Sequence, residues 1–443
     1  MRFSYRSPRH TADTTRHRDK HGQDHDSKPA AWGHRLNGAD ITIIIATHNR
    51  RETLLNTLER VTGLRSQGAT LEIIVVDNAS TDGTPGGVAE RFKDVTVLAR
   101  RDNRGSCAKA YAVDRASGRF IVFLDDDSHP QSGCLDRMIG HFNADDRLGA
   151  AGFVVHLPDG RCECSAFGNV FVGCGVGFRA EALRAVGGLD ADFFMQAEEF
   201  DLSFRLINAG WGVETFDDLH VDHLKTPQAR LSARTTFYDT RNNLRIVDRY
   251  LCGGHRRIYR QDWMQRYYWL AVANRHRGSF FKATLAALLW ARRDRHRFAH
   301  SKLTPAAFET LFRHRYTSMR MTQLRKQGIS SVVFADLGKN IYAFYRAARR
   351  AYVTIMAVVD DRFASPGRRY RGIPIVPTAA INTIDPHAVV ISNTAPVHAE
   401  ATEERLKALV TAPVHRWFGF RSAFAAHFSS TGQAQPADMT QIA

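Results

Sequence analysis

Apolar runs that stop at polar loops alternate with amphipathic stretches along the first third of the chain. Residues 41–45 and 71–76 are rich in Ile, Leu and Val, which predicts two buried β-strands. Between them, Leu54, Leu55 and Leu58 recur at helical spacing. Strands separated by helices in this way predict an α/β fold with a mostly parallel sheet. The alternation continues with helices expected at 88–92 and 106–116 and strands expected at 95–98 and 121–124.

Polar loops follow three of these strands, at 47–50, 77–84 and 125–128. The carboxyl ends of parallel strands meet at one edge of a sheet, so the three loops are expected to line one crevice. The last loop begins with three consecutive carboxylates, Asp125 to Asp127. Such a cluster is costly unless a cation or a ribose shares it, and the alternative is a solvated acidic turn.

The rest of the chain is less regular. A helix is expected at 198–208, and a small βαβ unit near the carboxyl end, with strands at 332–334, 353–359 and 388–391 around a helix at 341–350. We expect five parts: a disordered basic arm (1–39), an α/β domain (40–250), a basic helical segment (251–328), the βαβ domain (329–428) and a flexible tail (429–443).

The charge balance predicts a polyanionic partner. The formal net charge is +16 and the pI is about 9.9, which fits nucleic acid, an anionic membrane surface or a diphosphate substrate. No run approaches the roughly 18 apolar residues of a membrane span, and the amino terminus lacks the apolar core of a signal peptide. We therefore expect a cytoplasmic protein, peripheral at the inner face of a membrane at most. The six cysteines show no metal-binding spacing and are expected to be free thiols.

The stretch 255–325 is helical in pattern, rich in arginine and interleaved with aromatic residues. This combination suits a surface helix that meets anionic lipid headgroups. The alternative is a basic helical subdomain that packs on the core.

Five short motifs occur in a fixed order: Ala-Thr-His-Asn-Arg at 46–50, Val-Asp-Asn-Ala-Ser-Thr-Asp-Gly-Thr at 76–84, Asn-Arg-Gly at 103–105, Leu-Asp-Asp-Asp-Ser at 124–128 and Glu-Glu-Phe-Asp-Leu at 198–202. This series resembles the family 2 glycosyltransferases, over about half of the chain (40–250). The resemblance implies the GT-A nucleotide-sugar-binding fold and a nucleotide-diphosphate sugar donor.

The resemblance also implies a donor site. Thr47, Asn49 and Asp77 would hold the nucleobase and ribose, although a turn-forming role is the alternative for Asp77. Asp125 and Asp127 would bind Mg²⁺ or Mn²⁺ and so neutralise the diphosphate. Further substrate contacts are expected from Arg50, Asn103, Asp125 and Asp126.

A histidine completes the metal site in related enzymes, and His223 matches that position best. His220 would point to the opposite face if strand alternation holds. An imidazole beside two carboxylates favours Mn²⁺. Arg241 would reach a phosphate, or alternatively pack within its helix.

The helix at 198–208 would supply the catalytic base. Related enzymes usually have Glu-Asp here, so Glu199 stands where the catalytic aspartate is expected, and Glu198 is the alternative. The base would accept the proton of the acceptor hydroxyl during direct displacement, which inverts the anomeric configuration.

The carboxyl-terminal unit resembles the Rossmann-like domain fused to some sugar-modifying enzymes, at 332–340 and 368–375. Of the dinucleotide-binding glycines only Gly338 remains, with Asp336 and Asn340 where others would stand. We expect this domain to serve packing, dimerisation or ligand sensing rather than NAD binding.

The sequence therefore predicts an inverting, metal-dependent hexosyl or deoxyhexosyl transferase. Its expected acceptor is an envelope polysaccharide or a lipid-linked saccharide, and a homo-oligomer stays open. A sugar nucleotidyltransferase is one alternative, but the loop at 47–50 lacks the glycines it would need. A nucleic-acid-binding protein is the other, but carboxylates at strand ends repel phosphate without a metal.

Overall fold

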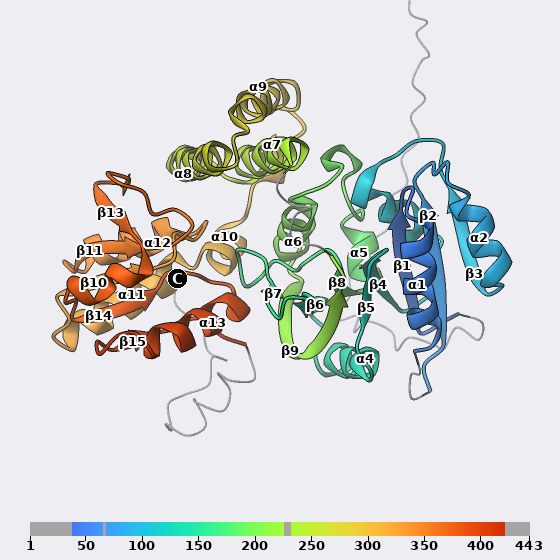
Figure 1. Cartoon of the computed structure of the whole chain (residues 1–443), viewed down its shortest axis with the longest axis horizontal. Helices are drawn as coiled ribbons and strands as arrows, with labels where there is room; N and C mark the ends of the chain where they lie inside the picture. The colour runs from blue at the N-terminus through green and yellow to red at the C-terminus, as the bar shows by residue number, and fades with distance from the viewer. Residues whose placement is uncertain (1–37, 65–67, 226–231, 421–443) are drawn as a thin grey trace, which may run out of the picture. The chain divides into compact units, whose positions relative to one another are not determined.

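A computed structural model describes residues 38–64, 68–225 and 232–420. The predicted arm, up to residue 37, and the whole of the predicted tail lie outside the described residues. Figure 1 shows the arrangement of the helices and strands.

The first half of the larger sheet is parallel, as predicted. Its strand order is β3-β2-β1-β4 (Figure 1). Thr47 pairs with Asp77, and Ala46 pairs with Asp125, so the three polar loops do emerge at the same edge. The four strands are β1 (Ile41–Thr47), β2 (Leu71–Asp77), β3 (Val95–Ala99) and β4 (Phe120–Asp125).

The second half of this sheet is mixed, in the order β4-β8-β6-β9-β5, with β7 beside β6. Strand β5 begins directly after Asp127 and runs antiparallel to the end of β9, where Ser128 lies opposite His223. This pairing brings His223 back to the acidic loop. The added strands are β5 (Ser128–Pro130), β6 (Leu148–His156), β7 (Cys162–Glu163), β8 (Gly175–Arg179) and β9 (Gly212–His223).

Helices cover both faces of the larger sheet, because alternate residues of each buried strand point to opposite sides. Ile43 and Ile45 pack in one core with α1 and α4, whereas Ile44 packs in the other with α6 and α7. The helix expected at 106–116 is instead a 3₁₀ turn at Gly105–Lys109 followed by the single turn α3 (Ala110–Val113). The other helices here are α1 (Arg51–Thr62), α2 (Thr84–Arg91), α4 (Cys134–Ala144), α5 (Ala180–Ala185), α6 (Glu198–Asn208) and α7 (Ala233–Tyr250).

The basic segment is helical, as its pattern indicates, and forms α8 (Gly253–Ala273), α9 (Arg277–Arg293), α10 (Pro305–Phe312) and α11 (His314–Lys326). Across the described ranges, no helix is both long and apolar enough to cross a membrane. All six cysteines are free, in agreement with the prediction.

The carboxyl-terminal unit is larger than the βαβ unit expected. Its sheet has the order β12-β13-β11-β10-β14-β15 and is parallel except for the β12–β13 pair. The unpredicted strands are only two to four residues long, too short to leave an apolar run in the sequence. The elements are β10 (Ser331–Ala335), α12 (Ile341–Arg350), β11 (Thr354–Val359), β12 (Arg369–Tyr370), β13 (Ile373–Val376), β14 (Ala388–Ile391), α13 (Pro396–Lys407) and β15 (Val414–His415).

Candidate active site

The three consecutive aspartates after β4 are held by side-chain cations. The Lys109 ammonium lies 2.6 Å from Asp125 Oδ1. The Arg50 guanidinium bridges the other two, at 2.6 Å from Asp126 Oδ1 and 2.8 Å from Asp127 Oδ2. The Thr47 hydroxyl donates to Asp126 Oδ2 at 2.8 Å. The acidic loop is therefore an organised cluster of charges and not a solvated turn.

These partners decide the protonation of each carboxyl. Burial would raise the pKa of Asp125, but the nearby Lys109 and His223 together outweigh it and lower the pKa. Burial likewise opposes the bonds from His223 and Arg50 that lower the pKa of Asp127. For Asp126 burial prevails and raises the pKa to about 6. The two outer carboxyls of the loop are thus anionic at neutral pH.

Metal-binding atoms converge beside this loop. His223 Nε2 lies 3.1 Å from Asp127 Oδ1. Ligand atoms of Asp125, Cys174 and His223 lie within 4.8 Å of one another. Two carboxylates with an imidazole suit a divalent cation such as Mn²⁺, so the donor set fits the predicted metal. Of the three ligands expected from the sequence, Asp125 and His223 belong to this group together with Cys174, and Asp127 contacts His223 from outside the group.

His223 is oriented from its other side. Its Nδ1 lies 3.2 Å from Glu163 Oε2 and 3.4 Å from Cys174 Sγ. Burial lowers the pKa of His223, but the bonds with Asp127 and Cys174 prevail and raise it to about 10. His220 pairs instead with His156, Nδ1 to Nε2 at 3.0 Å, away from the acidic loop.

Polar side chains of the loops after β1, β2 and β3 hydrogen-bond to backbone amides of the same or a neighbouring loop. Asn49 Oδ1 accepts the Thr81 amide at 2.7 Å, and Asn103 Oδ1 accepts the Gly105 amide at 2.8 Å. Asp77 is buried, and its Oδ2 accepts the Ser80 amide at 3.1 Å. Its other oxygen, Oδ1, is buried with no hydrogen-bond partner in the described part of the chain. That oxygen is available to accept a hydrogen bond from a ligand.

The two adjacent glutamates at the start of α6 have different surroundings. Glu198 is buried, and its Oε1 accepts a hydrogen bond from the Ser106 hydroxyl. Glu199 is only partly buried. Burial raises the pKa of both, and for Glu199 the nearby Glu198 carboxylate raises it further. Asp201 is fully buried between Arg205, Arg249 and Tyr250 and is a structural residue.

A lysine from the carboxyl-terminal unit reaches this helix. Lys339, in the turn after β10, donates to Asn243 Oδ1 on α7 at 2.7 Å, and its ammonium lies 4.0 Å from the centroid of the Phe200 ring. Burial lowers the pKa of Lys339 to about 7. The positive charge of Lys339 in turn opposes the upward shift of the Glu199 pKa.

Sequence reasoning missed both lysines. Lys109 lies in a stretch that looks like an ordinary amphipathic helix, and Lys339 is remote in sequence from every family motif. A signal existed for each: Lys109 stands between alanines on an otherwise buried face, and Lys339 follows the only remaining glycine of the degenerate loop.

Arg241, a predicted phosphate ligand, lies on α7. Its guanidinium donates to the carbonyl oxygens of Asp192 and Phe193 at 3.1 and 3.0 Å. It also lies 4.6 Å from the centroid of the Trp290 ring. Here Arg241 fixes the turn that precedes α6, and a phosphate contact stays a prediction.

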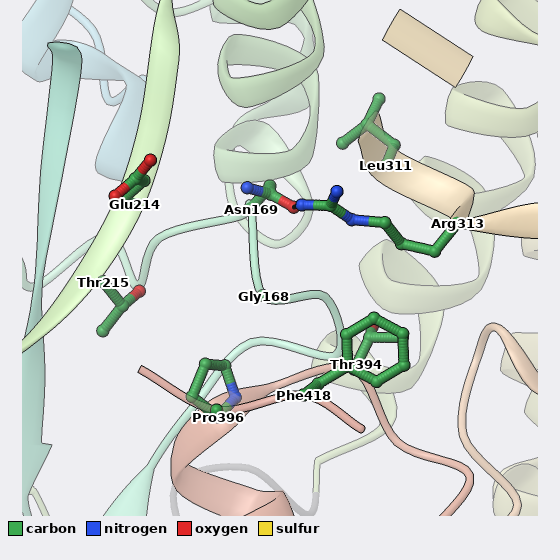
Figure 2. Close-up of a pocket in the computed structure, with 10 residues that line it drawn as sticks. Gly168, Asn169, Glu214, Thr215, Leu311, Arg313, Thr394, Pro396 and Phe418 are labelled. Atoms are coloured by element: carbon green, nitrogen blue, oxygen red, sulfur yellow. Dashed lines mark hydrogen bonds between the residues drawn. The ribbon is translucent and has the colours of Figure 1, made fainter. Parts of the chain in front are cut away.

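A separate cavity of about 320 Å³ contains none of the predicted site residues (Figure 2). Arg313 reaches across it and donates to Asn169 Oδ1 at 3.2 Å. Glu214, Thr394 and Phe418 lie on its walls. It does not contain the converging carboxylates seen at the edge of the larger sheet.

Known protein families match this region of the chain. Residues 42–163 match the model of glycosyl transferase family 2, and residues 162–305 match glycosyl transferase family group 2. Together the matches run from 42 to 305, more than half of the 443 residues. Residues 42–305 are thus similar to family 2 glycosyltransferases, in two adjoining matches.

Several curated relatives are similar to this chain over part of their length. The succinoglycan biosynthesis protein ExoO of Rhizobium meliloti is 35% identical over 108 residues, covering 24% of this chain and 30% of ExoO. The pre-mycofactocin glycosyltransferase of Mycobacterium tuberculosis is 26% identical over 213 residues, 42% of each chain. The N-acetylglucosaminyl-diphospho-decaprenol L-rhamnosyltransferase of M. tuberculosis is 25% identical, covering 32% of this chain and 62% of that protein. The chain thus spans less than two thirds of each relative.

Solved structures with some likeness include a mannosyltransferase from Pyrobaculum calidifontis in complex with GDP-Man and Mn²⁺. The TM-score is 0.41 and the sequence identity 21%, and the aligned part covers 62% of this chain and 84% of the mannosyltransferase. GalNAc-T7 with UDP, GalNAc and Mn²⁺ has a TM-score of 0.44 and 13% identity and covers 61% of this chain and 59% of its own.

Proposed function

We propose that this protein transfers a sugar from a nucleotide-diphosphate donor to a hydroxyl acceptor, with inversion and with the help of a divalent cation. The observation that supports this most directly is the convergence of Asp125, Asp127 and His223 at the carboxyl edge of the parallel strands. The match of residues 42–305 to glycosyltransferase family models supports the reaction class.

Asp77 would receive the nucleobase through its buried, unpartnered Oδ1. Thr47 would orient Asp126, which lies between the two predicted metal ligands in the loop and is placed for the donor sugar. Asp125, Asp127 and His223 would hold the cation, with Cys174 beside them. When bound, a divalent cation supplies positive charge against the leaving diphosphate. Arg50 and Lys109, which already pair with these carboxylates, add positive charge at the same place.

We assign the role of general base to Glu199. Its side chain is more accessible than that of Glu198, which is buried and bonded to Ser106. A raised carboxyl pKa brings a base closer to neutral pH, where proton transfer is most effective. Glu199 would take the proton of the acceptor hydroxyl while that oxygen attacks the anomeric carbon from the side opposite the diphosphate, which inverts the configuration.

The acceptor we propose is a growing envelope polysaccharide or a lipid-linked saccharide. The relatives named for succinoglycan biosynthesis and for a decaprenol-linked rhamnosyl transfer support this class.

The first experiment is calorimetry of the purified protein with UDP-, dTDP- and GDP-sugars, with and without Mn²⁺. We expect one nucleotide sugar to bind only with the metal and to lose that binding in Asp127→Ala. Asp361→Ala is the matched control. Asp361 lies in the loop after β11 of the other sheet, and it accepts hydrogen bonds from the amide and the hydroxyl of Thr378. If no nucleotide binds under any metal, the proposal is wrong.

A further inference from the structure

Helix α9 exposes a stripe of large apolar side chains. Phe281 is 61% exposed, Leu285 59%, Leu288 41% and Leu289 56%. Their spacing of four, seven and eight residues from Phe281 places all four on one face of the helix. We call these four residues the α9 stripe.

The stripe is unusual for this molecule. Ten large hydrophobic side chains are exposed among the described residues, and the α9 stripe supplies four of them. Another exposed hydrophobic side chain, Tyr268, lies on the adjacent α8. Its ring contacts that of Phe280 edge to face, with centroids 5.4 Å apart. Contiguous exposed apolar surface of this kind marks a binding face, whereas scattered single residues do not.

The opposite side of α9 is fixed. Phe280, Ala283 and Ala287 are buried, and Trp290 stacks on the Arg245 guanidinium of α7 at 3.5 Å from its ring centroid. Figure 1 shows α7, α8 and α9 side by side. Because this packing holds the helix, the stripe cannot rotate inward to become buried.

Basic side chains frame the stripe. Arg277 precedes Phe281 by about one turn and Arg292 follows it by about three turns, so both lie on the same face as the stripe. Lys282 and Arg293 are also exposed, and α9 contains no acidic residue. A face with apolar side chains and only positive charges complements an anionic lipid surface.

We propose that the α9 stripe docks the protein onto an anionic bilayer, with Phe281 and the three leucines in the headgroup region and the arginines on the phosphates. This inference rests on the proposed function in one respect: it names a membrane-held, lipid-linked saccharide as the acceptor. A soluble acceptor would not need such a surface.

The docking face is linked to the candidate base through two contacts. Trp290, in the last turn of α9, packs against Arg241. Arg241 donates to the carbonyls of Asp192 and Phe193, a few residues before Glu198 and Glu199. A helix lying on the membrane would thus hold the turn before α6 at a fixed position above the bilayer.

The test is co-sedimentation with vesicles of phosphatidylcholine alone and of phosphatidylcholine mixed with phosphatidylglycerol. We expect the full chain to bind only the anionic vesicles, with affinity falling as salt is raised. The variant Phe281→Ser/Leu285→Ser/Leu289→Ser should bind them on the order of tenfold or more weakly. Met319→Ser/Tyr352→Ser, which removes two exposed apolar side chains from outside α9, should bind like the original protein.

A second variant separates charge from apolar burial. Lys282→Glu/Arg292→Glu keeps the stripe and should lose anionic binding while remaining folded by circular dichroism. The inference is wrong if the original chain ignores anionic vesicles, or if the serine variant binds them unchanged. Light scattering gives a further way to contradict the inference. If the original protein is a dimer that does not bind vesicles, and the serine substitutions make it a monomer, the stripe joins two copies of the chain and the inference is wrong. None of these measurements uses a sugar donor, so they are independent of the donor calorimetry.

Discussion

The parallel parts of the two sheets differ at the carboxyl ends of their strands. We call the ends of β1, β2 and β4 the first edge, and the ends of β10 and β11 the second edge. At the edge of β1, β2 and β4, acidic side chains converge with a histidine and keep an unpartnered oxygen on Asp77. At the edge of β10 and β11, Asp360 also ends a strand, but its Oδ2 accepts the Leu337 amide at 2.8 Å and its Oδ1 accepts the Arg362 amide at 3.0 Å. At the first edge side-chain cations hold the carboxylates and one buried oxygen, Asp77 Oδ1, has no partner among the described residues, whereas at the second edge backbone amides occupy both oxygens of Asp360.

Helix α8 accounts for much of this difference. Trp263 Nε1 donates to the Lys339 carbonyl at 2.9 Å, and Arg266 donates to the Leu337 carbonyl. A Cβ on Gly338 would lie 2.9 Å from the Ser392 carbonyl oxygen. The loop after β10 is therefore packed against protein where a dinucleotide fold would place pyrophosphate. Instead of binding a dinucleotide, this loop places Lys339 against α6 and α7, which pack on the larger sheet.

The largest effect is expected from Glu199→Gln, which removes the proposed base from the first edge. Without a proton acceptor, kcat should fall by about 10²–10⁴-fold, while donor affinity stays within a few-fold of the original. Steady-state kinetics with calorimetry checks both. Glu198→Gln is the matched variant: if it lowers kcat more than Glu199→Gln does, the two roles are exchanged.

Lys109→Met should break the first edge in another way. It leaves the Asp125 carboxylate without its ammonium partner. Asp125 is 38% exposed, so we expect a loss of about 2 kcal/mol in the free energy of unfolding, below the usual cost of breaking a fully buried pair. Urea denaturation measures the loss. Lys109→Arg should restore part of it, and an unchanged midpoint in Lys109→Met would show that the pair adds nothing to stability.

Lys339→Met tests whether the lysine after β10 changes the proton affinity of Glu199. Lys339 lowers the pKa of Glu199, so its removal should raise that pKa and shift the acidic limb of the kcat profile to higher pH. At neutral pH, kcat should fall on the order of tenfold. Lys339→Arg retains the charge and should keep the limb in place. If activity falls equally at every pH and the limb does not shift, Lys339 has a packing role alone. Glu198 and Asp239 also act on the charges of this region, and both variants leave them unchanged.

The smallest effect is expected from Trp263→Phe, which removes one hydrogen bond between α8 and the loop after β10. The free energy of unfolding should fall by about 1 kcal/mol, visible as a lower Tm in a thermal melt. Trp269→Phe is the control, because Trp269 packs against Phe363 through its ring. If both variants melt at the same temperature, the bond to the Lys339 carbonyl does not stabilise the docked loop.

Much of the first edge could be predicted from the sequence. Short apolar runs, each followed by a polar loop, predicted that β1, β2 and β4 end at a shared edge, because parallel pairing through helical crossovers places their carboxyl ends together. Helix α6 begins at Glu198 and ends at Asn208, as predicted. The sites' chemical roles stay predictions, and so do the domain boundaries.

The contacts that complete the cluster could not be predicted. Lys109 and Cys174 lie at no recognisable spacing from Asp125, and nothing local indicates that Glu163 would orient His223. The bounds of α7 were not predicted either. Two of its residues, Arg241 and Asn242, donate hydrogen bonds to backbone carbonyls of the segment before α6. These contacts join residues 16 to 60 positions apart, beyond the reach of any local pattern.

The sequence by itself determined the first four strands, the positions of their polar loops and the family that the motifs resemble, because periodicity and motif order are local properties of the chain. Only the tertiary structure decided which cations neutralise the acids, that β5 returns His223 to Asp127, and that Lys339 of the second sheet reaches α6. Those outcomes depend on how strands pair and helices dock across long separations, where burial and charge are set by neighbours that no local stretch of sequence contains.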